Sequence, residues 1–278
     1  MATVVRTRAE LRAELDRRTR PVGLVPTMGW LHAGHRALMV RAREENATTV
    51  VSIFVNPRQF GDPSDLARYP RNEAHDLAIC ETEGVDIVFA PSVDEVYPPG
   101  FDTVVSMGAI AQPLEGTARP GHFDGVATVV AVLFGLVGAD RAYFGQKDAQ
   151  QIAVIRRMAL DLAIPTAVVA CPTVREPDGL ALSSRNVHLS PAERAAAPVL
   201  RRALLAARDA WTTGERSGDA LRDRMRTVLA AEPLAIVDYV SCADAVTLAE
   251  LDRVDARALL SLAVRFGSTR LIDNEPLA

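Results

Sequence analysis

Two histidines close a glycine-containing segment that could do chemistry on phosphate. The segment reads PTMGWLHAGH over residues 26–35, follows a short apolar run and precedes a helical pattern. Helix N-termini present N–H groups to phosphate, and Gly29 and Gly34 permit close backbone approach. The spacing of His32 and His35 places both imidazoles on one helix face, where they could donate hydrogen bonds to phosphate oxygens. Two other interpretations stay open for the pair: surface histidines that cap a helix, and ligands of a metal ion.

A single lysine marks the second candidate. Lys147 is the only lysine among 31 basic residues, and it lies in YFGQKDAQQ, residues 143–151. A compact ammonium fits sites where the planar guanidinium of arginine does not. Gly145 would bring the backbone close to a nucleotide, and the carboxylate of Asp148 could bind Mg²⁺ or ribose. The alternatives are a solvated Lys147–Asp148 pair at a helix start, and a lysine that is unique by chance.

Two further segments carry polar side chains that, taken alone, indicate a binding function less specifically than the histidine pair and the lysine do. The segment REPDGLALSSRN, residues 175–186, ends in two serines and an arginine that could close over a triphosphate, or form an ordinary polar linker. The segment FVNPRQFG, residues 54–61, brings Asn56 and Gln59 to a strand end, where amides suit recognition of hydroxyl groups. For Asn56 the alternative is a simple Asn-Pro turn.

Composition limits the class of protein. The 278 residues are 49% hydrophobic and 24% charged, as in ordinary globular chains, and the net charge of -4 argues against a nucleic-acid partner. The start of the chain has no apolar targeting segment, so we predict a cytoplasmic protein. The longest uncharged apolar run, residues 125–139, is shorter than the roughly 20 residues of a membrane span, and we expect a buried helix and no membrane partner. Cys80, Cys171 and Cys242 lack metal-ligand spacing and are predicted to be reduced packing residues.

The elements that must position these residues alternate along the chain. Apolar runs predict strands at 22–27, 48–55, 86–90, 141–144 and 166–170, and an extended run at 103–107. Helices are predicted at 64–83, 123–137 and 148–162. Because alternating strands and helices imply parallel pairing, we predict an α/β domain over residues 1–172 with a doubly wound, Rossmann-like parallel sheet. Ligands should bind at the carboxyl ends of its strands.

Residues 173–278 are predicted to form a smaller α+β domain. After a loop rich in Pro, Asp, Gly and Ser, a capping box at Ser190 and Glu193 predicts a helix that runs to about residue 212. A second helix should begin at Ser217. The stretch 235–265 predicts two or three short strands.

Five segments occur in the order and spacing found in pantothenate synthetases: PTMGWLHAGH, FVNPRQFG with the later RYPR, GHFDGVATVV, YFGQKDAQQ and GLALSSRNVHLS. The chain resembles this family over residues 20–195. Residues 32–35 also resemble the H-x-G-H signature of the adenylyl-transferring superfamily, which includes class I aminoacyl-tRNA synthetases. The resemblance implies an ATP-dependent ligase that condenses pantoate with β-alanine through a pantoyl-adenylate and releases AMP and pyrophosphate, with Mg²⁺ as cofactor. It also implies a homodimer, which the apolar run at 125–139 favours.

The resemblance also implies roles for individual residues. Catalytic roles fall to His32, His35, Lys147 and Arg185, with His35 in the place of a proton donor. The residues implied to bind ATP are Met28, Gly29, Trp30, Leu31, His32, Ala33, Gly34, His35, Gly145, Gln146, Lys147, Asp148, Val174, Leu182, Ser183, Ser184 and Arg185. Gln59 and Gln151 match pantoate-binding positions, Gln59 also lies near β-alanine, and Asn56 is a third candidate for substrate. Mg²⁺ would arrive with ATP, and Asp148 is its one candidate protein ligand. The chain departs from the family pattern at Trp30, Ala149, Pro177 and His188.

The implied reaction needs no protein nucleophile, because the pantoate carboxylate itself attacks the α-phosphorus. A second domain that closes as a lid would protect the acyl-adenylate from water. Two other functions stay open at this stage. A nucleotidyltransferase of the same superfamily would need an extra basic patch for its acceptor phosphate, and a non-catalytic nucleotide-binding regulator would bind ATP without turnover.

Overall fold

The computed structural model describes residues 2–61 and 63–277, which form two compact units. The first unit comprises Met1–Gly145 and Val154–Cys171, and the second comprises Gln146–Ala153 and Pro172–Ala278. The sequence-based division after residue 172 differs from this grouping mainly in residues 146–153, which it assigned to the first domain.

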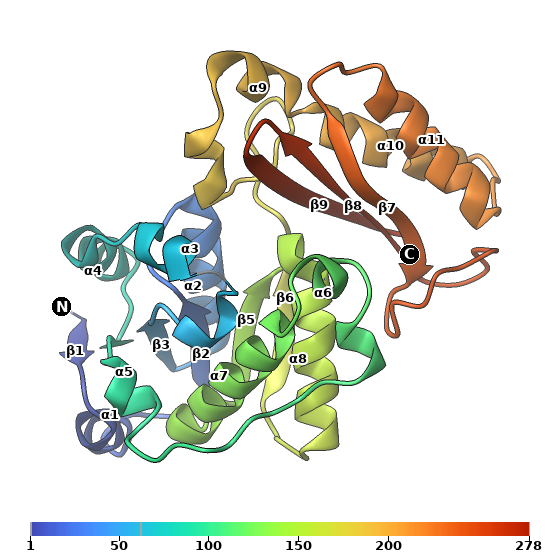
Figure 1. Ribbon diagram of the computed structural model, residues 1–278. Helices are drawn as coiled ribbons and strands as arrows, with labels where there is room; N and C mark the ends of the chain where they lie inside the picture. The colour runs from blue at the N-terminus through green and yellow to red at the C-terminus, as the bar shows by residue number, and fades with distance from the viewer. Residues whose placement is uncertain (1, 62, 278) are drawn as a thin grey trace. The chain divides into compact units, whose positions relative to one another are not determined.

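A six-stranded parallel sheet forms the centre of the first unit (Figure 1). Its strands are β1 (Thr3–Val5), β2 (Val22–Thr27), β3 (Thr48–Ile53), β4 (Ile87–Phe89), β5 (Arg141–Gly145) and β6 (Ala167–Cys171), in the spatial order β1-β4-β3-β2-β5-β6. The predicted doubly wound parallel sheet is therefore confirmed. Strand β1 was not predicted, because three residues are too few to establish an alternating pattern.

The helices of this region are α1 (Arg8–Leu15), α2 (Ala33–Glu45), α3 (Pro63–Arg68), α4 (Glu73–Thr82), α5 (Val93–Val96), α6 (Glu115–Ala118), α7 (His122–Val137) and α8 (Ala149–Asp161). Three 3₁₀ helices, η1 (Pro57–Gln59), η2 (Ala109–Ala111) and η3 (Gln146–Asp148), complete it. Of these elements, η3 belongs to the second unit, and helix α8 begins in the second unit and ends in the first. Helices α2 and α4 bury Leu38, Met39 and Cys80 against the sheet.

One predicted element of this unit is corrected, and a second is defined more closely. The single helix expected at 64–83 is two helices, because Pro70 follows α3 and the Asn72 side chain begins α4 by accepting a hydrogen bond from the N–H of His75 at 3.2 Å. The run at 103–107, predicted only to be extended, pairs with no described strand. Its N–H groups at Val105 and Met107 donate instead to side chains of α7.

The order of the strands fixes where a ligand site can form. From β2 the chain adds β3 and then β4 on one side, whereas β5 and β6 lie on the other side of β2. The pairing of β2 with β5 is confined to Gly23–Arg141 and Leu24–Ala142, so the carboxyl ends of the two strands are not hydrogen-bonded to each other. This switch point is where open α/β sheets form a ligand crevice.

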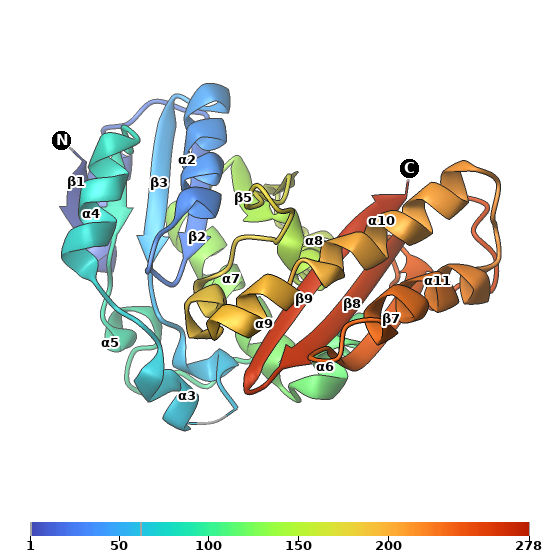
Figure 2. The ribbon, with the colours of Figure 1, turned by 90° about the horizontal axis from the view of Figure 1, so that it is seen from above.

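The second unit is an antiparallel sheet covered by helices (Figure 2). Its strands β7 (Ile236–Asp244), β8 (Ala258–Phe266) and β9 (Thr269–Leu277) pair in the order β7-β8-β9. Its helices are η4 (Ser184–His188), α9 (Pro191–Ala196), α10 (Val199–Thr212) and α11 (Gly218–Ala230). Helices α10 and α11 lie side by side and bury Leu204 and Met225 in a core shared with Leu262 of the sheet.

The predicted α+β domain is confirmed, with two corrections. The capping box at Ser190 and Glu193 is present, but the helix that it begins ends at Ala196, and Pro198 precedes a separate helix. The third strand lies beyond residue 265, where the sequence prediction stopped.

Burial accounts for the three cysteines. Cys80, Cys171 and Cys242 are all buried and unpaired, as the sequence predicts. Burial raises the pKa of Cys80 to about 12 and that of Cys242 to about 11, so both thiols stay protonated near neutral pH. Within residues 2–61 and 63–277, no helix is long and apolar enough to cross a membrane, and the apolar α7 is only 16 residues long.

Candidate active site

The loop after β2 is held in place by one buried carboxylate. Asp76 of α4 is 1% exposed, and its two oxygens accept hydrogen bonds from the N–H groups of Trp30 at 2.9 Å and Leu31 at 2.7 Å. Gly29 adopts a φ of +80°, and a Cβ added there would lie 2.8 Å from an Asp76 oxygen. The loop therefore needs glycine at position 29, both for its backbone conformation and for the close carboxylate.

The two histidines cap helix α2. The N–H of Gly34 donates to Nδ1 of His32 at 3.1 Å, and the N–H of His32 donates to Nδ1 of His35 at 3.3 Å. The rings are stacked at a tilt, with centroids 4.1 Å apart. Because Nδ1 accepts in both rings, each neutral imidazole carries its proton on Nε2. Capping, one of the interpretations left open by the sequence, is therefore present, and it gives each ring an N–H donor at Nε2.

The glycine of the H-x-G-H segment has a steric reason. A Cβ at Gly34 would lie 2.8 Å from Cε1 and 3.0 Å from Nδ1 of His32. Real Cβ atoms rarely come this close to another atom, so a larger residue would displace the imidazole. Glycine at position 34 thus leaves room for the ring that caps the helix.

The amide of Asn56 is fully used inside the protein. Its nitrogen donates to Oε1 of Gln59 and to the carbonyl of Gly125, both at 3.0 Å. Its oxygen accepts from the hydroxyl of Tyr97 at 2.8 Å and from the N–H of Arg58 at 3.2 Å. An asparagine side chain has two N–H donors and two acceptor lone pairs, and all four are occupied. Asn56 therefore orients its neighbours, and the substrate-binding role predicted for it stays a prediction.

The orientation of Gln59 follows from that network. Its Oε1 accepts from Asn56, so its amide nitrogen points away from Asn56 and can donate elsewhere. Its main-chain carbonyl contacts Nδ1 of His122 at 2.9 Å. Burial raises the pKa of Tyr97 to about 12, which keeps its hydroxyl a donor to Asn56 at physiological pH.

Helix α7 has a glycine, Gly125, where the turn of Arg58 and Gln59 packs against it. A Cβ at Gly125 would lie 2.3 Å from the carbonyl oxygen of Arg58. The side chain of Arg58 lies over the rings of Tyr97 and Phe101, with its guanidinium carbon 4.7 and 4.8 Å from their centroids. The GHFDGVATVV segment thus serves the Gln59 turn, although none of its residues was singled out from the sequence.

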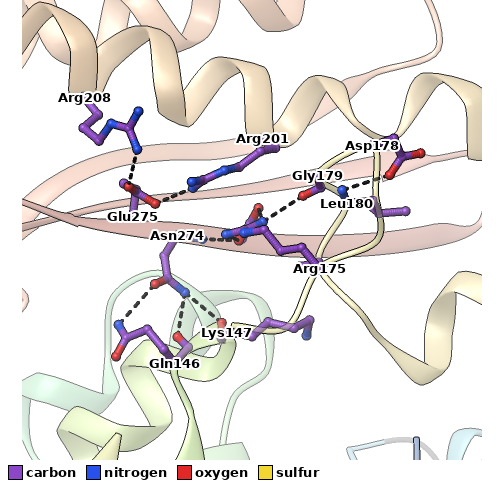
Figure 3. Close-up of polar contacts among 12 residues, drawn as sticks. Gln146, Lys147, Arg175, Asp178, Gly179, Leu180, Arg201, Arg208, Asn274 and Glu275 are labelled. Carbon is purple, nitrogen blue, oxygen red and sulfur yellow. Dashed lines mark hydrogen bonds and ion pairs between the residues drawn. The ribbon is translucent and has the colours of Figure 1, made fainter. Parts of the chain in front are cut away.

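In the second unit, Lys147 lies in a turn that β9 holds by its backbone (Figure 3). Its side chain is 15% exposed, and its Nζ is 3.7 Å from Asp148, whose side chain is 47% exposed. The Lys147–Asp148 pair is thus present, but the lysine is the more buried of the two. Gly145, which ends β5, has no atom within 4 Å of where a Cβ would lie.

The segment from Val174 to Arg185 folds back on itself. The N–H of Leu182 donates to the carbonyl of Val174 at 2.9 Å, so two predicted ATP-binding positions lie opposite each other. Ser183 caps η4 by accepting from the N–H of Arg185 at 3.2 Å. Arg185 is exposed, and Ser184 and Gln151 are partly exposed.

Lys147 and Ser183 line one small pocket in the second unit. The residues that complete its lining are Leu180, Ala181, Asn186, Leu200, Leu271, Ile272 and Asp273. Two residues that the sequence placed in separate segments are therefore brought together. The Oδ1 atom of Asn186, also in this lining, is buried and has no hydrogen-bond partner among the described residues.

Asp76, Tyr97 and Gly125 support the site but were missed from the sequence. Each forms hydrogen bonds with a residue far away in the sequence. Asp76 accepts from Trp30 and Leu31, which lie 46 and 45 residues before it. The Asn56 amide lies 41 residues before its partner Tyr97 and 69 before its partner Gly125. Periodicity and spacing do not report such contacts. The only sequence feature pointing to Gly125 was its place in a motif.

Comparison with known proteins gives a consistent result. The model of the Pantoate-beta-alanine ligase family matches residues 3–276. A pantothenate synthetase from Roseiflexus castenholzii is 62% identical over 271 residues, and the match covers 98% of each chain.

Solved structures agree with the sequence comparison. The crystal structure of pantothenate synthetase from Thermus thermophilus is similar with a TM-score of 0.93 and 51% identity, covering 98% of each chain. Pantoate-beta-alanine ligase from Francisella tularensis, solved with beta-gamma ATP and beta-alanine, is similar with a TM-score of 0.81 and 32% identity, over 99% of this chain and 97% of that one. With these similarities spanning nearly every residue, the chain belongs to the pantoate-beta-alanine ligase family.

Proposed function

We propose that the protein condenses (R)-pantoate with β-alanine, using ATP, to give pantothenate, AMP and pyrophosphate through a pantoyl-adenylate. The observation that carries this is the H-x-G-H segment, capped by its own imidazoles at the switch point of the sheet. This is the place where open α/β sheets bind ligands, and a helix N-terminus there favours phosphate. The Francisella relative, solved with an ATP analogue and β-alanine, supports the same substrates.

ATP would be held by the residues that the family resemblance implies. These are Met28 to His35, Gly145 to Asp148, Val174 and Leu182 to Arg185. Charge builds up on the α-phosphate as the pantoate carboxylate attacks and pyrophosphate leaves. The Nε2 protons of His32 and His35 and the charges of Lys147 and Arg185 would stabilise that charge, with His35 donating the proton.

Pantoate would be recognised by amides. Gln59 is held with its NH₂ group directed away from Asn56, so it would donate to a hydroxyl or carboxylate of pantoate. Gln151, partly exposed in the first turn of α8, would make the second contact. In the second half-reaction the β-alanine amine attacks the pantoyl carbonyl near Gln59, forming the amide bond as AMP leaves.

Mg²⁺ would be bound mainly by ATP itself. Among the described residues, no group of three or more His, Cys, Asp or Glu side chains could enclose an ion. Asp148, half exposed, could supply one carboxylate oxygen, which fits a metal shared with triphosphate oxygens. The bound ion would neutralise charge on the phosphates.

Isotope exchange between pyrophosphate and ATP tests the proposed reaction. With Mg²⁺ present, we expect exchange with pantoate alone, and none with β-alanine alone or with neither. Exchange that ignores pantoate, or intact ATP binding with no exchange and no AMP when both substrates are present, would overturn the proposal.

A homodimer, a lid role for residues 173–278 and a cytoplasmic location remain predictions. The apolar run behind the dimer prediction is α7, which is largely buried within the first unit, so only the family resemblance supports a dimer. Light scattering at working concentration would test the dimer, and a monomer would dismiss it. Small-angle scattering with and without ATP would test the lid, and an unchanged radius of gyration would count against it.

A further inference from the structure

Asn274 is a buried side chain that grips the turn carrying Lys147. It lies on β9 and is 4% exposed. Its amide nitrogen donates to the main-chain carbonyls of Gln146 and Lys147, both at 2.9 Å (Figure 3). Its oxygen accepts from Nε2 of Gln146 at 3.2 Å. One carboxamide thus makes three hydrogen bonds to two consecutive residues of the turn.

The three bonds need two donors and one acceptor, which a carboxamide supplies. The two carbonyls need donors, and the Gln146 amide nitrogen needs an acceptor, so the partners fix which end of the Asn274 side chain is nitrogen. An aspartate of the same shape would offer only acceptors, and its oxygens would face two carbonyl oxygens. The preference for asparagine is therefore chemical and not steric.

The neighbours of Asn274 hold its strand firmly. The carboxylate of Asp273, 3% exposed, binds Arg175 through two nitrogens at 2.6 and 2.9 Å. Arg175 also donates to the carbonyl of Gly179 at 3.1 Å, within the segment that leads to Ser183. On the other side, Glu275 pairs with Arg201 and Arg208 of α10. Three consecutive residues of β9 therefore bind three separate segments of the second unit.

We propose that Asn274 is a positioning residue for adenylate formation: by fixing the backbone of Gln146 and Lys147, it sets where the Lys147 ammonium lies. This inference rests on the proposed function of Lys147. Asn274 itself need not touch ATP. Because displacing a catalytic group by about 1 Å can cost roughly 100-fold in rate, loosening the turn should be visible in the adenylation step.

The kinetic test compares variants in pyrophosphate exchange. Asn274→Asp and the milder Asn274→Ala should lower kcat for exchange by roughly 10- to 100-fold, with a smaller change in the KM for pantoate. The matched control is Glu275→Gln, which weakens two ion pairs of the next residue on β9. It should lower the melting temperature but leave kcat unchanged.

A double-mutant cycle asks whether Asn274 acts through Lys147. In a Lys147→Ala background, Asn274→Ala should cost little further rate, because the group that it positions is already gone. Full additivity of the two losses would overturn the proposal. So would a Glu275→Gln variant that loses as much kcat as Asn274→Ala, since the effect would then be general to the strand.

A second readout needs no catalysis. Because Lys147 is the only lysine, the amines that acetic anhydride can acetylate are its side chain and the α-amine, which serves as an internal reference. In the folded protein without substrates, Lys147 should be acetylated several-fold faster, relative to the α-amine, in Asn274→Ala than in the wild type. In Glu275→Gln the relative rate should equal that of the wild type. Equal rates in the wild type and Asn274→Ala would overturn the positioning role. If the wild type shows no exchange and no protection of Lys147 by ATP, the proposed function fails instead, and the acetylation rates still decide the role of Asn274.

Discussion

The loop before α2 and the turn before α8 both follow a strand of the parallel sheet, but opposite chemistry holds them. Asp76 accepts from two backbone N–H groups in the first unit, whereas Asn274 donates to two backbone carbonyls in the second. A loop that must hold its N–H groups in a fixed array suits a carboxylate. The turn around Lys147 leaves two carbonyls that need donors, which a carboxamide supplies. In both, a buried polar side chain from an element distant in the sequence fixes the backbone conformation through hydrogen bonds.

The largest effect should come from the group that the turn presents. Lys147→Ala should lower kcat by roughly 10²- to 10³-fold, as expected for loss of one group that stabilises developing charge. The melting temperature should barely change, because among the described residues the ammonium forms an ion pair only with the half-exposed Asp148, at 3.7 Å. Steady-state kinetics with thermal unfolding would show both. Near-normal turnover would remove the catalytic role of Lys147, and Lys147→Arg tests whether charge alone suffices.

The loop of the first unit should respond to loss of its carboxylate. Asp76→Asn keeps one acceptor but turns an NH₂ group toward the second N–H, so we expect about 1–3 kcal/mol lower stability. Adenylation should fall by roughly 10-fold or more as the loop loosens.

The matched control for Asp76 lies at the other end of β2. Asp140 accepts from the N–H of Val22 at 2.6 Å, far from the loop along the strand. Asp140→Asn should reduce stability without changing pyrophosphate exchange. Equal losses of exchange in the two variants would mean that Asp76 acts through general stability.

Two glycines of α7 allow a sharper test of the Gln59 turn. Gly125→Ala would place a Cβ 2.3 Å from the carbonyl of Arg58, so the turn must shift and the KM for pantoate should rise about 10-fold or more. Gly135→Ala, in the same helix, meets no atom within 4 Å and should stabilise the protein by about 0.5–1 kcal/mol. Substrate titration and denaturant unfolding would separate the two. An unchanged KM in Gly125→Ala would contradict the link to Gln59.

The smallest effect on catalysis is expected from the buried thiols. Burial raises the folded pKa of Cys80 from 9 to about 12 and that of Cys242 from 9 to about 11. The stability that these thiols contribute is complete below pH 9. It is lost as the pH rises further, because the unfolded chain then releases protons that the folded chain keeps.

Each thiol should add about 1.4 kcal/mol per pH unit to that loss, up to about pH 11 for Cys242 and about pH 12 for Cys80. Urea unfolding across pH 8–11 would measure the slope, and Cys80→Ala should reduce it while leaving kcat unchanged at pH 8. An identical slope in Cys80→Ala would contradict the raised pKa.

Much of the fold follows from local patterns. Alternating apolar runs and helical patterns predicted β2 at its observed bounds and α7 to within one residue, because buried strands and helices leave strong apolar signatures. The helix boundaries were wrong at Pro70 and Pro198, where a single proline separates two helices. Strands β1 and β9 were missed, since one has only three residues and the other lies beyond residue 265.

By itself, the sequence determined the family, the parallel α/β architecture and the residue types available for chemistry, including the histidine pair and the single lysine. The tertiary structure decided what each side chain does. Asn56 was a candidate for substrate binding from its spacing, but its amide is hydrogen-bonded to other groups of the protein. Asp76 and Asn274 hold the backbone of segments that lie 46 and 128 residues away in the sequence. Hydrogen bonds across such separations depend on how the elements pack. Local spacing and periodicity carry no record of that packing.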